Sequence, residues 1–147
     1  EAANQGWIDS FHSGYDLVAL KIIDDHIGNE NHNFRHIVRD AVSKGARYYL
    51  NHFFLPDGTV KYYHQNAEPL DAHAFSHALI CLHELRTLVS IPEDLMDKVL
   101  ERLISLFWNG QHYFYWQINH GRLNRLPCMR WVQAWVLLGL SVYLLSK

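Results

Sequence analysis

The stretch Trp7-Ile8-Asp9-Ser10-Phe11-His12-Ser13-Gly14-Tyr15 brings an acid, an imidazole, a phenol and an indole to the start of a long apolar segment. An Asp followed closely by a His recurs at Asp71 and His73, where a second apolar segment begins. A third apolar segment opens at Arg130 and Trp131. Because Asp is a favoured residue at helix N-termini, we predict that long helices begin at these places.

The hydrophobic pattern predicts five helices. The first, over residues 10–26, and the last, over residues 129–145, are apolar on nearly all sides, which is typical of buried helices. The second, over residues 34–54, is amphipathic, and its apolar face is formed by Phe34, Ile37, Val38, Ala41 and Val42. The third spans residues 72–89. The fourth starts at a capping box in residues 90–93 and runs to about residue 108.

Two of the connections carry turn signals followed by residues typical of strands. Pro56-Asp57-Gly58 precedes the segment 59–63, which is rich in Thr, Val and Tyr. Asn109-Gly110 precedes the aromatic segment 113–118, which a second turn at Asn119-His120-Gly121 follows. We therefore predict two short β-hairpins in the loops of an otherwise all-α chain.

The order of elements repeats. A buried helix, an amphipathic helix and a turn with an aromatic strand are followed by another buried helix, and the helix starts recur about every 60 residues. Stacked two-helix units bury a core only by contacting their neighbours. Five helices make two and a half units with open ends. Residues 1–147 are therefore predicted to form one domain of stacked helical hairpins, either a fragment of a larger ring or a self-associating half.

Composition limits the classes of function. A chain of 147 residues with 49% hydrophobic content can bury one domain core, which excludes a disordered protein. The formal net charge of −2 argues against a nucleic-acid surface, which would need clustered basic residues. The content of aromatic residues, 14%, and the 11 His suit clefts for sugars or small molecules, although large helical cores use the same residues.

The two cysteines bear on the compartment. Cys81 and Cys128 are too few for a disulfide scaffold and fall in or beside apolar helices, so we expect buried thiols in a cytoplasmic protein. The most apolar run, residues 131–145, is short for a membrane span of about 20 residues, and we predict no membrane association. The chain starts at Glu1 without an initiator Met or a visible signal peptide, so residues are expected before it.

A resemblance to a known group adds to this interpretation. The segments Gly6 to Tyr15, Phe53 to Gly58, Tyr62-Tyr63 and Pro69 to His73 resemble, in the same order, parts of bacterial α/α-toroid proteins related to the six-hairpin glycosidases. Proteins of that group are associated with polysaccharide genes. The resemblance implies alternating inner and outer helices, with inner-helix N-termini around a carbohydrate-binding funnel. A full toroid has six hairpins, and this chain supplies about half of one.

Four polar residues at the helix starts are candidate catalytic groups. Asp9 and Asp71 suit a general acid and base on either side of a glycosidic bond, but either can also be only an N-cap. His12 and His73 occupy equivalent places and suit proton transfer in a lyase or an epimerase. Alternatively, each simply hydrogen-bonds a neighbouring loop.

Other residues near the helix starts suit substrate binding. Tyr15 with Arg130 would fit a lyase that neutralises a uronate carboxylate. Four aromatic residues are possible platforms for stacking sugars, although packing of loops on the core explains them equally: Trp7, Tyr63, Trp116 and Trp131.

The residue types predict no metal and no cofactor. His73 and His77 have the i,i+4 spacing of metal ligands on a helix, but no HExxH motif and no third ligand accompany them. We therefore expect a carbohydrate-active domain that binds or processes a poly- or oligosaccharide as a hydrolase, lyase or epimerase. The alternative is a helical-repeat module that binds a partner and has no chemistry of its own. The expected partners of the chain are a carbohydrate and either further copies of the chain or the remainder of a toroid.

Overall fold

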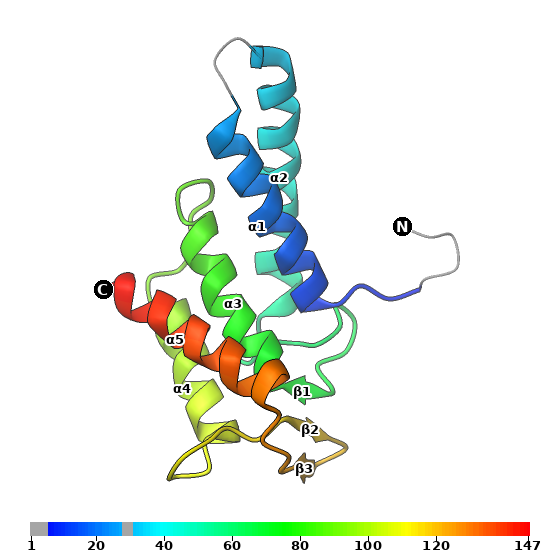
Figure 1. Cartoon of the computed structure of the whole chain (residues 1–147). Coiled ribbons are helices and arrows are strands. Elements are labelled where there is room, and N and C mark those ends of the chain that lie inside the picture. Colours follow the sequence, from blue (N-terminus) through cyan, green and yellow to red (C-terminus); the bar gives the residue numbers. More distant parts are fainter. Residues whose placement is uncertain (1–5, 28–30) are drawn as a thin grey trace.

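The computed structural model describes residues 6–27 and 31–147, most of which are helical (Figure 1). This part of the chain contains five α-helices, as predicted. Their bounds are α1, Ser10–His26; α2, His32–Phe53; α3, Ala72–Leu85; α4, Leu95–Phe107; and α5, Ala134–Leu145. A π-helical turn, η2 (Met129–Gln133), leads directly into α5.

Helices α1, α3 and α5 form a row in which α3 packs against both of the others. All three begin at the same end of the molecule, and α2 lies along α1 while α4 lies along α3 (Figure 1). The described residues thus form two helical hairpins and a fifth helix. The N-termini of the three helices in the row lie beside one another, and this arrangement brings together residues far apart in the sequence.

Two glycines allow close approach within the row. A Cβ atom added to Gly14 of α1 would lie 2.6 Å from Nδ1 of His77 in α3. A Cβ atom added to Gly139 of α5 would lie 2.7 Å from the carbonyl oxygen of Ser76, also in α3. Real Cβ atoms do not approach other atoms this closely, so the spacing on both sides of α3 depends on the missing side chain.

The core is divided into two clusters, and α3 contributes to both. Phe75 and Leu79 pack in a cluster with residues of α4 and the last helix, including Phe107. Cys81 and Leu85 pack in a second cluster with residues of α1 and α2. Helix α3 therefore packs on both sides because it is the central helix of the row.

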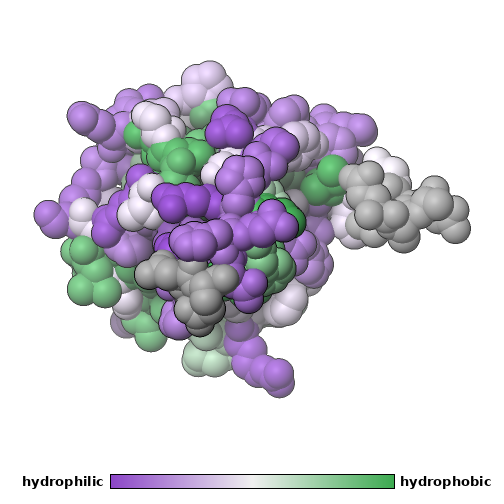
Figure 2. All heavy atoms as spheres, turned by 90° about the horizontal axis from the view of Figure 1, so that it is seen from above, coloured by the Kyte–Doolittle hydropathy of each residue, from purple (hydrophilic) through white to green (hydrophobic). Residues whose placement is uncertain are grey.

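Helices α1 and α2 are less buried than predicted. Ile22 and Ile23 of α1 are exposed, whereas Lys21 and Asp24 are buried on its inner side. Phe34 and Ile37, which were assigned to the apolar face of α2, are also exposed. Viewed from the end where α1 and α2 are joined, hydrophobic side chains lie among mainly hydrophilic ones (Figure 2). The prediction that α1 is buried all round is wrong, because α1 packs against α2 and α3 and the side that carries Ile22 and Ile23 is exposed.

A small antiparallel sheet lies beside the N-terminus of α3. Its strands, β1 (Leu70–Asp71), β2 (Gln117–Asn119) and β3 (Arg122–Asn124), are paired in this order. His120 and Gly121, with φ of 48° and 71°, join β2 to β3, as a two-residue hairpin turn requires. The second predicted hairpin is therefore present, and the added strand β1 was not predicted.

The first predicted hairpin is reduced to a turn with a single bridge, between Phe54 and Val60. The residues that follow pair instead with the chain before α1. Tyr63 forms a bridge with Asp9, and the Tyr62 carbonyl accepts a hydrogen bond from Ser10 N at 2.9 Å. The aromatic segment thus holds the start of α1 in place.

Two helix boundaries differ from the prediction. Helix α3 ends at Leu85, four residues before the predicted end, and turns follow it. The predicted capping box at residues 90–93 does not start α4, which begins at Leu95 after a turn closed by a 3.1 Å hydrogen bond from Leu95 N to the Pro92 carbonyl. No helix within residues 6–27 and 31–147 is both long and apolar enough to cross a membrane.

Candidate functional site at the helix mouths

Asp9 caps α1 and holds an imidazole beside it. Its Oδ1 accepts a hydrogen bond from His12 N at 2.8 Å, and its Oδ2 lies 2.7 Å from His12 Nδ1. The Asp9 carboxylate is buried, whereas the His12 side chain is 68% exposed. Local sequence explains this pair, because an N-cap carboxylate reaches the amide and the side chain three residues on. The cap therefore also presents an imidazole to solvent.

Asp71 caps α3 and is held from the other side by the sheet. Its Oδ1 accepts a hydrogen bond from His73 N at 2.9 Å. Its Oδ2 accepts from Trp116 Nε1 at 3.1 Å and from Gln117 Nε2 at 3.0 Å. Burial raises the pKa of Asp71, although these three donors act in the opposite direction. The Asp9 and Asp71 carboxylates are therefore structural caps. Both lie at the helix mouths, by which we mean the N-terminal ends of α1, α3 and η2.

A short hydrogen bond joins the mouth of α1 to that of α3. The Tyr15 hydroxyl lies 2.6 Å from His73 Nε2. The other ring nitrogen, His73 Nδ1, is buried and has no hydrogen-bond partner among the described residues. Burial, assisted by the charge of His12 and opposed by Asp9, lowers the pKa of His73 to about 4. Burial, followed by the charge of Asp9, raises the pKa of Tyr15 to about 12. Both groups are therefore neutral near pH 7 and share a single proton on this bond.

Aromatic rings surround the Tyr15–His73 pair. The His73 ring lies 5.2 Å from that of Phe11, 4.9 Å from that of Trp131 and 4.9 Å from that of Trp135, measured between centroids. Tyr15 lies 5.4 Å from Trp135. The pair is thus flanked by aromatic rings from α1, η2 and α5, and His73 is buried while Tyr15 is partly exposed.

The remaining predicted residues lie around the Tyr15–His73 pair, with the exception of Arg130. Trp7 packs edge-on to Tyr63, with ring centroids 5.5 Å apart, beside the Asp9 bridge. Trp116 lies on the Asp71 side of the sheet. Arg130 is exposed on η2, and no contact joins it to Tyr15 within the described residues. Asp9, His12, Tyr15, His73 and Trp131 are therefore brought together, Asp71 and Trp116 flank them, and Arg130 stands apart.

Several residues at this site were not identified from the sequence. Trp135 follows Trp131 by four residues and Phe11 precedes Tyr15 by four, so both could have been placed on the same helix faces. His77, one turn after His73, was considered only as a metal ligand; its ring centroid lies 4.1 Å from that of Tyr15. Gln117 could not have been found in this way, because its bond to Asp71 depends on the pairing of β1 with β2.

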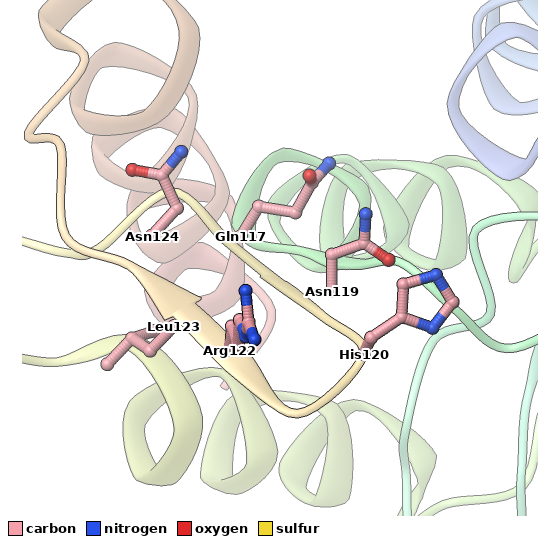
Figure 3. A pocket seen from close by; sticks show the side chains of 6 residues that line it. All are labelled: Gln117, Asn119, His120, Arg122, Leu123 and Asn124. Atoms are coloured by element: carbon pink, nitrogen blue, oxygen red, sulfur yellow. The ribbon is translucent and has the colours of Figure 1, made fainter.

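A pocket of about 650 Å³ adjoins the Asp71 side of the site (Figure 3). It is formed on the β2–β3 hairpin, and its lining residues are Gln117, Asn119, His120, Arg122, Leu123 and Asn124. Gln117 belongs both to this pocket and to the hydrogen bonds around Asp71. The pocket and the hydrogen bonds around Asp71 therefore share one side chain.

The described residues include no group of three or more His, Cys, Asp or Glu side chains arranged to hold a metal ion. The rings of His73 and His77, which have the spacing of metal ligands, pack edge to face with centroids 6.4 Å apart. Cys81 is buried and Cys128 is partly exposed, and both are free thiols.

Comparisons with protein-family models, with curated proteins and with solved structures found no match for this chain.

Proposed function

We propose that this chain is a carbohydrate-active domain of the α/α-toroid type, which binds or processes a poly- or oligosaccharide at the mouths of α1, α3 and η2. The observation that carries this proposal is the 2.6 Å contact between the Tyr15 hydroxyl and His73 Nε2. It joins two residues from different helices that are both predicted to bind substrate or transfer protons. The row of helices with their N-termini at one end agrees with the funnel that the resemblance implies.

The Tyr15–His73 pair is suited to proton transfer. A lyase and an epimerase both need one group that removes a proton from a sugar carbon and another that returns a proton. The Tyr15 hydroxyl gives its proton to His73 Nε2 as the Tyr15 oxygen removes the proton of the sugar carbon, and the reverse transfer returns a proton to that carbon. Hydrolysis would instead use Asp9 and Asp71, whose carboxylates are both engaged as caps. The geometry therefore favours a lyase or an epimerase over a hydrolase.

The aromatic side chains supply the surface for a sugar ring. Trp131 is about half exposed and packs on His73, and Trp7 is similarly exposed beside Tyr63. The apolar faces of sugar rings stack on exposed indoles of this kind. A saccharide chain lying between these two indoles would pass over the His12 and Tyr15 side chains.

The experiment measures oligosaccharide binding and turnover by the wild type and by Tyr15→Phe and His73→Gln. Reducing ends report hydrolysis, ultraviolet absorption of an unsaturated product reports elimination, and NMR reports inversion of a stereocentre. Loss of a general acid or base should lower the rate by about 10²–10⁴-fold. Tyr48→Phe, which removes a hydroxyl from the outer surface of α2, should retain full activity. Full activity of Tyr15→Phe and His73→Gln would refute the proton-transfer proposal.

One observation favours the alternative, a module that binds other proteins. Leu137, Leu144 and Leu145 of α5 are 68%, 72% and 81% exposed, and Met129, at the start of η2, is 72% exposed. Large exposed apolar side chains grouped on one element mark interaction surfaces. This face would be covered by a second copy of the chain or by the remainder of a toroid. If a second copy covers it, sedimentation should show a dimer or larger species that Leu144→Glu dissociates, and a stable wild-type monomer would contradict this self-association.

A further inference from the structure

The outer face of the β2–β3 hairpin carries an unusual set of side chains. Gln117 pairs with Asn124 and Asn119 with Arg122, and residues directly opposite in an antiparallel pair share one face. Ile118 and Leu123 are on the other face and pack against the core. The outer face thus consists of three amides and one guanidinium, and these side chains line the pocket of Figure 3.

Arg122 is the cation that this pocket offers to a ligand. It is exposed and has no ion pair in the described part of the chain. The imidazole at the rim is occupied, because His120 Nδ1 lies 3.4 Å from the Glu68 carboxylate, which also accepts from His120 N at 3.1 Å. Glu68 therefore faces His120 and leaves Arg122 unpaired.

The amides next to Arg122 have spare hydrogen-bonding groups. Asn124 Oδ1 accepts from Leu126 N at 3.1 Å, which leaves its NH₂ group without a partner among the described residues. The Asn119 side chain offers both a donor and an acceptor. A guanidinium binds a carboxylate or sulfate with two parallel hydrogen bonds, while amides bind the hydroxyls beside it. Together these groups match the charged group and the neighbouring hydroxyls of one acidic sugar ring.

The pocket is also linked to the N-terminus of α3 by hydrogen bonds. Gln117 extends from the pocket to Asp71, and Asp71 caps the helix that carries His73. A chain of sugars bound at the Tyr15–His73 pair could therefore continue across Trp116 and Gln117 onto the hairpin.

We propose that the outer face of the β2–β3 hairpin is a subsite for an anionic sugar residue, whose carboxylate or sulfate binds Arg122 and whose hydroxyls bind Asn119 and Asn124. This inference rests on the proposed function and adds the charge of the substrate. The domain then selects acidic saccharides at a position away from the proton-transfer pair.

The test is calorimetric binding of tetrasaccharides to the whole chain. The probes are tetramers of galacturonate, glucuronate and mannuronate, their neutral methyl esters, and a sulfated carrageenan tetramer. The acid tetramers should bind more tightly than their esters, and the uronate and sulfate probes distinguish the two sources of negative charge. Arg122→Gln should weaken binding of the acid form by about tenfold, as expected for loss of a charge-assisted hydrogen bond, and should leave binding of the ester unchanged.

Arg125→Gln is the matched control. Arg125 is a neighbouring exposed cation, but it lies over the Tyr115 ring, 5.9 Å from its centroid, and does not line the pocket. Its removal should not change the preference for acid over ester. If acid and ester tetramers bind the wild type equally, or if Arg122→Gln loses no more than Arg125→Gln, the subsite is refuted while saccharide binding stands. If no tetramer of either kind binds, the proposed function fails as well.

Discussion

Gly14 of α1 lies against the imidazole of His77 in α3, so closely that a Cβ atom at Gly14 would stand 2.6 Å from Nδ1 and 3.5 Å from the Tyr49 hydroxyl. Helices α1, α2 and α3 therefore meet at Gly14, which has no side chain to separate them. This contact sets the distance between α1 and α3, and the Tyr15–His73 bond depends on that distance.

Gly14→Ala should destabilise the fold. The added methyl group has no room between the helices, and overpacking of this kind costs about 1–3 kcal/mol of unfolding free energy. Chemical denaturation monitored by circular dichroism measures the loss. Gly6→Ala is the control, because no atom lies within 4 Å of an added Cβ there. Equal stability of the two variants would show that the helices can move apart freely.

Stability should fall as the pH falls below about 6.5. Burial lowers the pKa of His73 to about 4 and that of His77 to about 3, whereas both take up protons near pH 6.5 when the chain is unfolded. The unfolded state then binds more protons than the folded state. Each histidine therefore contributes a loss of about 1.4 kcal/mol per pH unit below that value.

Urea unfolding between about pH 7 and about pH 5 measures this slope. The raised pKa of Asp71 acts in the opposite direction and is the same in each protein compared. His77→Gln should make the slope shallower, while His112→Gln, at an exposed position, should leave it unchanged. An identical slope in all three proteins would mean that His77 titrates equally in both states.

The two thiols should react at very different rates. Cys81 is fully buried and burial raises its pKa, so little thiolate forms. Cys128 is partly exposed at the start of η2. Titration of the native protein with a disulfide reagent should modify Cys128 first, and Cys81 only after unfolding. Cys128→Ser should abolish the fast phase, and a fast phase that persists in this variant would contradict the burial of Cys81.

Trp116→Phe should destabilise the start of α3. The substitution removes the donor at 3.1 Å from Asp71 Oδ2 and leaves part of a buried carboxylate without its partner. The expected loss is about 1–3 kcal/mol. Trp108→Phe is a suitable control, because Trp108 packs on Phe114 and has no side-chain hydrogen bond among the described residues. If both variants lose equal stability, the bond to Asp71 contributes nothing beyond packing.

The starts of the helices could be predicted from sequence because their causes are local. Asp9 and Asp71 both cap helices with bonds to residues two or three positions on, as their positions before apolar segments indicate. The turn at His120 and Gly121 was predictable for the same reason. The capping box at residues 90–93 was misleading, because Pro92 closes a separate turn before α4 begins.

Long-range pairing could not be predicted in this way. The addition of β1 to the hairpin joins Leu70 to Ile118, and no local pattern marks a two-residue strand. The exposure of Phe34 and Ile37 also escaped prediction, because the sequence gives the apolar side of α2 but not where α1 ends beside it. The Tyr15–His73 contact was missed as a pair although both residues were selected, because it depends on the spacing of α1 and α3.

Asp71 is at once the last residue of β1 and the N-cap of α3, and this double position has a consequence for hydrogen exchange. The Ala72 amide bonds to the Trp116 carbonyl and the His73 amide to the Asp71 side chain, so neither is released while the strand stays paired. These amides and those of the sheet should exchange with solvent at one common rate. The hairpin and the first turn of α3 would then open as a single cooperative unit, and a ligand bound to either would slow exchange in both.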